Sequence, residues 1–249
     1  MVLRAGVSLA CACLAGSLGT AVAGDWDSSN VQLLYGHGFD DRYTGANSGG
    51  GGLATFTFET LSVRDWGDSF LFVDVNGGRL VDFDGDRRDR STQVYAEWQP
   101  RLRLGRGDMD AGALRAVYLA SQINAGDDGF RAGLIGFGAD FALPGFTAFG
   151  ANLYWRDDTV NRPTAQLTVF WSAVLGDADS GWSSEGFLDL AGTDRDGTDV
   201  VFQPRLLNDV GRGLGGRPGR WYAGLEWYYH RNDALAVSVP QLMLKRVLP

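Results

Sequence analysis

The segment Ser91–Leu104 (STQVYAEWQPRLRL) alternates between apolar and polar side chains. A period of two is the period of a β-strand, in which successive side chains point to opposite faces of the sheet. Such a strand fits two kinds of protein: a soluble sandwich with one face on its core, or a membrane barrel with one face in lipid and the other in a polar lumen. Pro100 favours the barrel, because a central strand of a soluble sheet does not normally carry a proline.

The N-terminus predicts export across a membrane. A positively charged start, Met1–Arg4, precedes the apolar and small-residue run Ala5–Gly19 and the cleavage signal Ala21-Val22-Ala23. The run is too short for a membrane helix, and its flanks are typical of a secretory signal peptide. We therefore predict a signal peptide over residues 1–23 and one mature domain, an outer-membrane β-barrel, over residues 24–249.

Both cysteines of the chain, Cys11 and Cys13, lie in the predicted signal peptide. The mature domain would then have no disulfide, thiolate metal site or cysteine nucleophile. Neither cysteine follows the residues of a lipoprotein signal, so we do not expect lipidation. The formal net charge of −8 provides no basic surface for phosphates, so we expect no nucleic-acid partner.

The composition is typical of a membrane barrel. The chain has 36 glycines, 14 phenylalanines, 8 tryptophans and 8 tyrosines but only 7 prolines. Glycine-rich turns and aromatic girdles at the membrane interfaces suit a barrel, although a secreted soluble β-protein could share this composition. After the signal peptide no apolar run of about 18 residues occurs, which excludes membrane-spanning helices.

Twelve segments have strand character, and most have the roughly 9–11 residues that a tilted strand needs to cross a bilayer. The segment 184–191 alternates weakly, and the last one changes parity at Pro240, which predicts a β-bulge there. The pattern predicts an all-β fold, a closed antiparallel transmembrane β-barrel of about twelve strands. The segments are 28–36, 53–64, 68–76, 91–104, 114–124, 130–142, 146–156, 164–175, 184–191, 199–207, 220–230 and 235–247.

The connections support a barrel with both termini in the periplasm. Odd-numbered connections would then lie outside the cell and tend to be long, as are the first, His37–Gly52, and the third, Gly77–Arg90. The turns around Asp65-Trp66-Gly67 and Leu143-Pro144-Gly145 are short, as expected for the periplasmic side. The long connection Asn208–Gly219 is an exception.

A short motif occurs twice in the chain. Trp98-Gln99-Pro100-Arg101-Leu102 and Phe202-Gln203-Pro204-Arg205-Leu206 share an aromatic residue followed by Gln-Pro-Arg-Leu. In each copy, Gln and Arg fall on the polar face of the strand. The repeat is either a chance similarity between barrel strands or two matched Gln/Arg pairs that point into one lumen.

The polar face of each strand predicts the lining of the lumen. Both charge signs occur in similar number there, so we expect no strong ion filter, which needs a ring of one sign. Aromatic rings beside carboxylates and amides suit a flat base or a sugar face, but they could also simply fill a narrow barrel. The charged residues are Glu59, Asp74, Glu97, Arg101, Arg103, Asp140, Arg205 and Glu226, and the aromatic ones are Phe70, Phe72, Tyr95, Tyr118, Tyr154, Phe170, Tyr222 and Tyr228.

Signals for metals and catalysis are weak. The Asp-rich segments 82–86 and 194–199 have the aspartate spacing of calcium loops but no glutamate at the twelfth position. His37 and His230 are the only histidines, and no serine motif marks a nucleophile. We therefore predict no enzyme activity, no metal and no cofactor.

Four segments in order resemble the nucleoside-specific channel-forming outer-membrane proteins, the Tsx/OmpK-like family. The resemblance implies a twelve-stranded monomeric barrel through which nucleosides and deoxynucleosides diffuse, with some members serving as phage receptors. One departure is the C-terminus, because such barrels usually end in an aromatic residue read by the barrel-assembly machinery, and this chain ends Arg-Val-Leu-Pro. The segments are NVQLLYG (30–36), WGDSFLFVD (66–74), YAEWQPRL (95–102) and GLEWYYH (224–230).

Together these patterns predict an outer-membrane channel for passive diffusion of nucleosides or similar small neutral solutes, with outer-membrane lipid, assembly machinery and phage as further partners. The alternatives are a non-conducting surface receptor or structural barrel, and a membrane-embedded lipid hydrolase. The predicted solute-binding residues are Phe70, Phe72, Asp74, Tyr95, Glu97, Gln99, Arg101, Glu59, Gln203, Arg205, Glu226 and Tyr228.

Overall fold

Twelve β-strands make up almost all of the described chain. The structure is a computed structural model that describes residues 25–39, 51–80, 90–105, 112–127, 129–177, 179–213 and 215–249, which leaves the predicted signal peptide and the Asp82 segment outside the described residues. All twelve predicted strands are present. They are β1 (Trp26–Phe39), β2 (Gly51–Arg64), β3 (Gly67–Leu80), β4 (Arg90–Leu104), β5 (Leu114–Gly126), β6 (Arg131–Phe141), β7 (Ala148–Asp158), β8 (Thr164–Leu175), β9 (Trp182–Gly192), β10 (Thr198–Asp209), β11 (Trp221–Arg231) and β12 (Ala236–Val247), with one short helix, α1 (Val210–Gly213).

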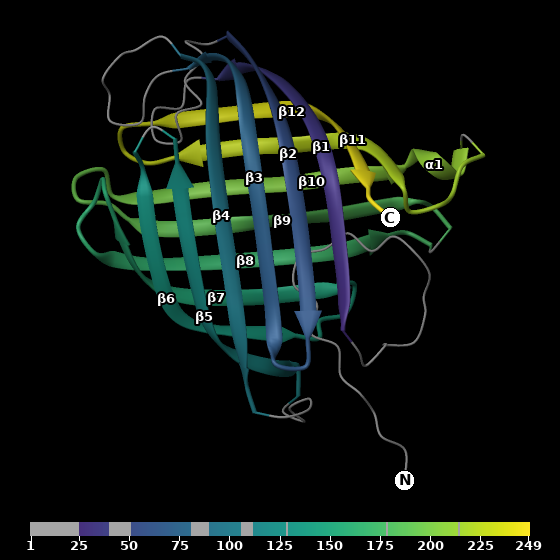
Figure 1. The fold of residues 1–249 in the computed structure, drawn as a ribbon, viewed down its shortest axis with the longest axis horizontal. Coiled ribbons are helices and arrows are strands. Elements are labelled where there is room, and N and C mark those ends of the chain that lie inside the picture. Colours follow the sequence, from purple (N-terminus) through teal and green to yellow (C-terminus); the bar gives the residue numbers. More distant parts are fainter. Residues whose placement is uncertain are drawn as a thin grey trace.

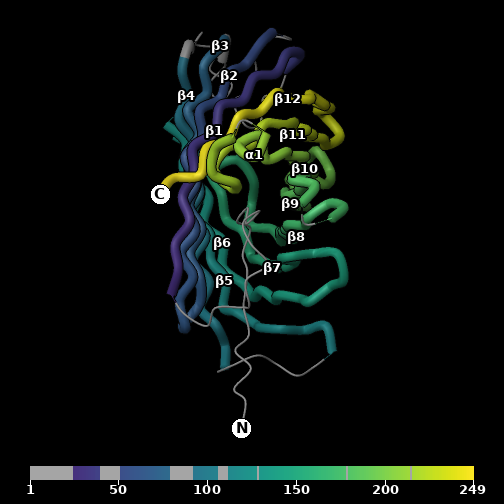
Figure 2. The backbone as a smooth tube through the Cα atoms, turned by 90° about the vertical axis from the view of Figure 1, so that its right-hand side faces the viewer, coloured from purple at the N-terminus to yellow at the C-terminus, as the bar shows by residue number. Residues whose placement is uncertain are grey.

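The strands form one closed antiparallel barrel. Each strand pairs with its neighbours in sequence, and β1 closes the ring by pairing with β12, as in the pair Leu33–Leu244. Figure 1 shows β1–β4 crossing β8–β12 at a steep angle, and Figure 2 shows these two walls facing each other across the interior. Closure removes both sheet edges, so every strand has a backbone partner on each side. The predicted fold class is confirmed.

Alternation along the strands separates an apolar outer surface from a polar interior. On β7, Leu153 and Trp155 are 60% exposed, whereas Asn152 and Tyr154 are each 2% exposed. The same pattern gives Phe137 64% and Leu242 68% exposure on the outside of β6 and β12. An outward apolar band with polar residues inside is the pattern of a barrel that sits in lipid.

The two prolines of the repeated motif lie at unpaired ladder positions. Pro100 pairs with Ser69 on β3, but the β4–β5 ladder skips Gln99 and Pro100 and resumes at Arg101 in the same register. The β10–β11 ladder skips Gln203 and Pro204 in the same way. Proline has no N–H to donate to the neighbouring strand. A short interruption of the pairing on one side of the strand therefore accommodates it without a bulge.

The predicted bulge at Pro240 is wrong. β12 pairs with β11 in one continuous register from Trp221–Arg246 to Arg231–Ala236, and buried and exposed residues alternate throughout. The apolar pattern in the sequence shifts at Pro240 because β12 carries apolar residues on both of its faces, not because the strand changes register. Val237 and Val239 point inward and pack against Phe39, while Pro240 points outward.

The barrel has two distinct ends. We call the end where β1 begins and β12 finishes the N/C end, and the opposite end the far end. The far-end connections after β5, β7, β9 and β11 are short turns, so the expectation that odd-numbered connections are long does not hold for them. The long connection 210–220 at the N/C end contains α1. Among the described residues, no helix is long and apolar enough to cross a membrane.

Candidate solute-binding lumen

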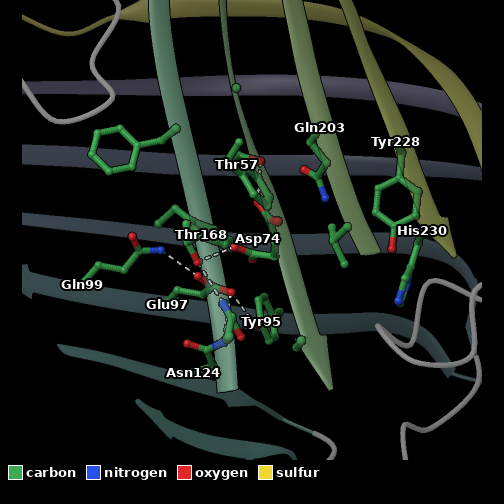
Figure 3. A pocket seen from close by; sticks show the side chains of 18 of the residues that line it. Thr57, Asp74, Tyr95, Glu97, Gln99, Asn124, Thr168, Gln203, Tyr228 and His230 are labelled. Carbon is green, nitrogen blue, oxygen red and sulfur yellow. Dashed lines mark hydrogen bonds between the residues drawn. The ribbon is translucent and has the colours of Figure 1, made fainter. Parts of the chain in front are cut away.

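The barrel encloses a water-accessible cavity of about 240 Å³. By the same measure, a cavity needs only about 10–15 Å³ to hold one water molecule. Side chains of the far-end turns, such as Asn161 and Thr193, line it, so the cavity extends to that end. All twelve predicted solute-binding residues lie in its wall, and Figure 3 shows several of them pointing into it. Their role in binding stays a prediction.

Four aromatic rings form a continuous row along one wall, which we call the aromatic row. Phe70 and Phe72 lie on β3, Tyr95 on β4, and Phe130 just before β6. Successive ring centroids are 6.1, 6.0 and 6.2 Å apart, and all four residues line the cavity. Inward-facing rings at this spacing offer apolar faces to a flat or ring-shaped solute.

Glu97 is the centre of a hydrogen-bond network beside the aromatic row. Tyr95 Oη donates to Glu97 Oε1 at 2.6 Å, and Asn124 Nδ2 donates to the same oxygen at 3.1 Å. Gln99 and Gln122 each donate from Nε2 to Glu97 Oε2 at 2.8 Å. Figure 3 shows Glu97 among Tyr95, Gln99 and Asn124. These bonds hold the carboxylate and its neighbours in fixed positions on the cavity wall.

A second polar group lies on β7, β8 and β9. Arg156 donates from Nε to Asp158 Oδ2 and from Nη1 to Gln166 Oε1, both at 2.6 Å. Thr168 Oγ1 donates to Asp189 Oδ1 at 2.5 Å. All five side chains line the cavity, so the lumen has polar groups on both of its walls.

Arg205 is the centre of an ion cluster that joins strands far apart in the ring, the Arg205 cluster. Its guanidinium contacts Glu226 at 2.6 Å, Glu59 at 2.8 Å and Glu185 at 3.2 Å. Lys245 adds a second cation, 3.0 Å from Glu185. Because the groups are buried, each must find its partner within the barrel.

The first copy of the repeated motif provides a second ion cluster, the Arg101 cluster. Arg101 donates to Asp68 through Nε at 2.8 Å and through Nη2 at 2.7 Å, and its Nη1 donates to Asp140 at 2.8 Å. The guanidinium carbon lies 4.2 Å from the ring centre of Tyr118 and 5.0 Å from that of Phe170. The two motif copies therefore project matched Gln and Arg side chains into one lumen.

The N/C end of the interior is filled with side chains. Five residues near the N/C-end termini of their strands are at most 1% exposed and lie outside the cavity wall. Tyr118 packs on Arg101, and Lys245 belongs to the Arg205 cluster. Side chains thus fill the interior at the N/C ends of β2, β5, β10, β11 and β12, while Asp68 and Arg101, near the N/C ends of β3 and β4, line the cavity. The five residues are Leu61, Tyr118, Leu207, Tyr222 and Lys245.

The cavity wall is strongly acidic, so the expectation of similar numbers of both signs is wrong. Among the described residues, nine carboxylates line it against three guanidinium groups, those of Arg101, Arg156 and Arg205. The carboxylates that sequence reasoning missed lie at strand starts and ends or on the weakly alternating β9. The nine are Glu59, Asp68, Asp74, Glu97, Asp158, Glu185, Asp189, Asp199 and Glu226.

His230 and the acidic turn after β9 have protein partners. His230 Nε2 lies 2.8 Å from Asp199 Oδ1, and Asn232 donates to the same oxygen at 2.9 Å. Asp194 accepts hydrogen bonds from the backbone N–H and the side chain of Arg162. Within the described ranges, no group of three or more His, Cys, Asp or Glu side chains is arranged to hold a metal ion.

Solved structures of other proteins share the barrel fold of this chain. No protein-family model and no curated protein matches the chain. Two structures of the KdgM porin, one alone and one in complex with disordered oligogalacturonate, match with TM-scores of 0.51 and 0.50 at 7% identity, over 89% of this chain and 98% of the porin. OccK5 (OpdH) of Pseudomonas aeruginosa gives a TM-score of 0.44 at 10% identity, over 91% of this chain and 98% of that one. The chain therefore has the barrel fold of the KdgM porin.

Proposed function

We propose that this protein is an outer-membrane channel that lets small uncharged ring-shaped solutes, nucleosides in particular, diffuse passively through its lumen. The aromatic row carries the proposal. Its rings offer stacking faces to a base or a sugar, and Glu97, Gln99 and Asn124 beside it offer hydrogen-bonding groups to hydroxyls and amides. The resemblance to the nucleoside-specific channel family, carried by four segments in order, points to the same solutes.

The proposed location follows from the surface and the export signal. The outward apolar band would contact outer-membrane lipid, with the N/C end in the periplasm and the far end outside the cell. In this orientation the open part of the cavity faces the medium. We propose cleavage of the signal peptide after residue 23, insertion by the barrel-assembly machinery and a monomeric state, with phage as a further partner at the outer surface.

A polyanionic solute such as the oligogalacturonate of the KdgM complex fits this lumen poorly. In the described part of the wall, nine carboxylates against three guanidinium groups would repel a chain of acidic sugars. A neutral solute of similar ring size meets no such barrier.

Single-channel recording in planar bilayers, with adenosine or thymidine added, tests the proposal. We expect the nucleoside to reduce the current in a concentration-dependent way, and Phe72→Ala to raise the half-blocking concentration. Phe137→Ala is the matched control, because it removes a ring that is 64% exposed on the lipid face. A pore that conducts but never responds to nucleosides would leave only a general diffusion channel.

The packed N/C end favours a second candidate, a non-conducting barrel used as a surface receptor or structural protein. Leu61, Tyr118, Leu207, Tyr222 and Lys245 fill that end of the interior. A purified, correctly folded barrel that gives no conductance at all would support this candidate over the channel.

A further inference from the structure

Three carboxylates in the cavity wall have no cationic partner. Among the described residues, no Lys, Arg or His side chain makes an ion pair with Asp74, Glu97 or Asp189. Glu97 accepts hydrogen bonds from Tyr, Gln and Asn side chains, and the two aspartates accept one each from a threonine hydroxyl. These donors are neutral, so within the described ranges none of the three carboxyl groups has a cation at ion-pair distance.

Each of the other described carboxylates of the cavity wall lies within ion-pair distance of an Arg, Lys or His side chain. Asp68 pairs with Arg101 and Asp158 with Arg156, while the three glutamates of the Arg205 cluster share Arg205 and Lys245. Asp199 contacts His230. Asp74, Glu97 and Asp189 are therefore the carboxyl groups of the described cavity wall that have no ion-pair partner.

The three groups come from both walls of the lumen. Asp74 lies on β3 directly opposite Tyr95 in the β3–β4 ladder, and Glu97 lies two residues further along β4. Asp189 lies on β9 and lines the same cavity as Glu97. All three line the cavity, so a solute that passes along the lumen meets carboxyl groups on both sides.

A buried acceptor without a donor lies next to this group. Asn152 is 2% exposed and lines the cavity, and its Oδ1 has no hydrogen-bond partner among the described residues. Its register partner on β8 is Thr168, the residue that donates to Asp189. Asn152 therefore adds a polar but uncharged side chain to the cavity wall beside Asp189.

We propose that the lumen selects by charge, admitting cationic and neutral donor-rich solutes and excluding anions, and that Asp74, Glu97 and Asp189 set this preference. The inference rests on the proposed channel function and names its substrate class. Carboxylates of one sign in a narrow lumen with low-dielectric walls focus the field, so cations concentrate there and anions are repelled. Phosphorylated nucleosides and acidic sugars would therefore be excluded, while nucleosides and amino sugars would enter.

The reversal potential across a planar bilayer under a KCl gradient tests this inference. At low salt we expect the wild-type channel to prefer K⁺ over Cl⁻ by about threefold or more, with the preference falling as added salt screens the carboxylates. The triple variant Asp74→Asn/Glu97→Gln/Asp189→Asn should bring the ratio close to 1. Each substitution keeps the size of the side chain and a hydrogen-bond acceptor. Asp177→Asn, in the exposed turn after β8, is the matched control and should leave the ratio unchanged.

Influx into proteoliposomes gives a second measurement. Glucosamine, glucose and glucuronate have similar size and differ in charge, and we expect influx to fall in that order. A conducting channel with a K⁺/Cl⁻ ratio of 1 or below, or with equal influx of glucosamine and glucuronate, would overturn the charge selection and leave the channel function intact. A complete absence of conductance would overturn the channel function and the selection together.

Discussion

Arg205 Nη1 on β10 lies 2.8 Å from Glu59 Oε1 on β2, across the interior of the barrel. Three strands, β11, β12 and β1, separate the two residues around the ring. The contact thus joins parts of the wall that share no backbone hydrogen bonds. Arg205 also contacts Glu185 and Glu226, so one guanidinium binds carboxylates from three strands.

Replacing Arg205 with methionine should destabilise the barrel. The variant leaves three buried glutamates with only Lys245, and removing one partner of a buried ion pair costs about 3–5 kcal/mol. We expect a lower urea midpoint for unfolding from lipid vesicles. In planar bilayers we also expect a larger conductance, because methionine lacks the guanidinium group that reaches across the interior to Glu59.

The double variant Arg205→Met/Glu226→Gln is the matched comparison. Removing one of the carboxylates that Arg205 neutralises should recover part of the lost stability. A single variant as stable as the wild type would show that the Arg205 cluster does not hold the walls together.

Arg101→Lys should also destabilise the barrel, although the charge is kept. Arg101 bonds Asp68 through two nitrogens and Asp140 through a third, and it lies over the ring of Tyr118. A lysine ammonium cannot reproduce that planar fork or the stacking. We expect a loss of about 1–3 kcal/mol in the free energy of unfolding, measured by urea titration. Arg195→Lys, in an exposed turn, should change nothing.

Substitutions at Tyr95 separate the ring from the hydroxyl. If the aromatic row stacks on solutes, Tyr95→Ala should weaken nucleoside block by about 5–10-fold, which corresponds to about 1–1.5 kcal/mol. Tyr95→Phe keeps the ring and loses only the 2.6 Å hydrogen bond to Glu97, so its block should stay close to wild type. Equal loss in both variants would assign the effect to the hydroxyl and contradict stacking.

The outer surface of β12 tests contact with lipid. Leu242 is 68% exposed and points away from the lumen. In a membrane, Leu242→Arg should cost about 2–4 kcal/mol if the site lies near the bilayer midplane, whereas Leu242→Ala should cost much less. Unfolding from lipid vesicles measures both, and similar stabilities would argue against a lipid-facing site.

Much of the architecture could be predicted from local pattern. The alternation in Ser91–Leu104 and in the other strands requires a sheet with one apolar and one polar face, and each of the twelve strands lies where it was expected. Parity also placed the predicted solute-binding residues correctly in the cavity wall. The alternation along each strand predicted these positions correctly because successive side chains of a strand point to opposite faces, whichever strands lie beside it.

Parity was misleading where both faces of a strand are apolar or where alternation is weak. On β12, Val237 and Val239 point inward to pack on Phe39, and this gave the false bulge at Pro240 and concealed the inward position of Lys245. On β9, Glu185 and Asp189 belong to the lumen although the strand showed little amphipathicity. An inward apolar residue can be recognised only once its packing partner on another strand is known.

The sequence by itself determined that the chain forms a barrel and which face of most strands is polar, because these depend on neighbours along the chain. Only the tertiary structure decided that Arg205 contacts Glu59, Glu185 and Glu226, while no cation among the described residues pairs with Asp74, Glu97 or Asp189. Ion pairs form over a few ångströms between strands distant in sequence. Barrel closure therefore sets which charges cancel and which remain in the lumen.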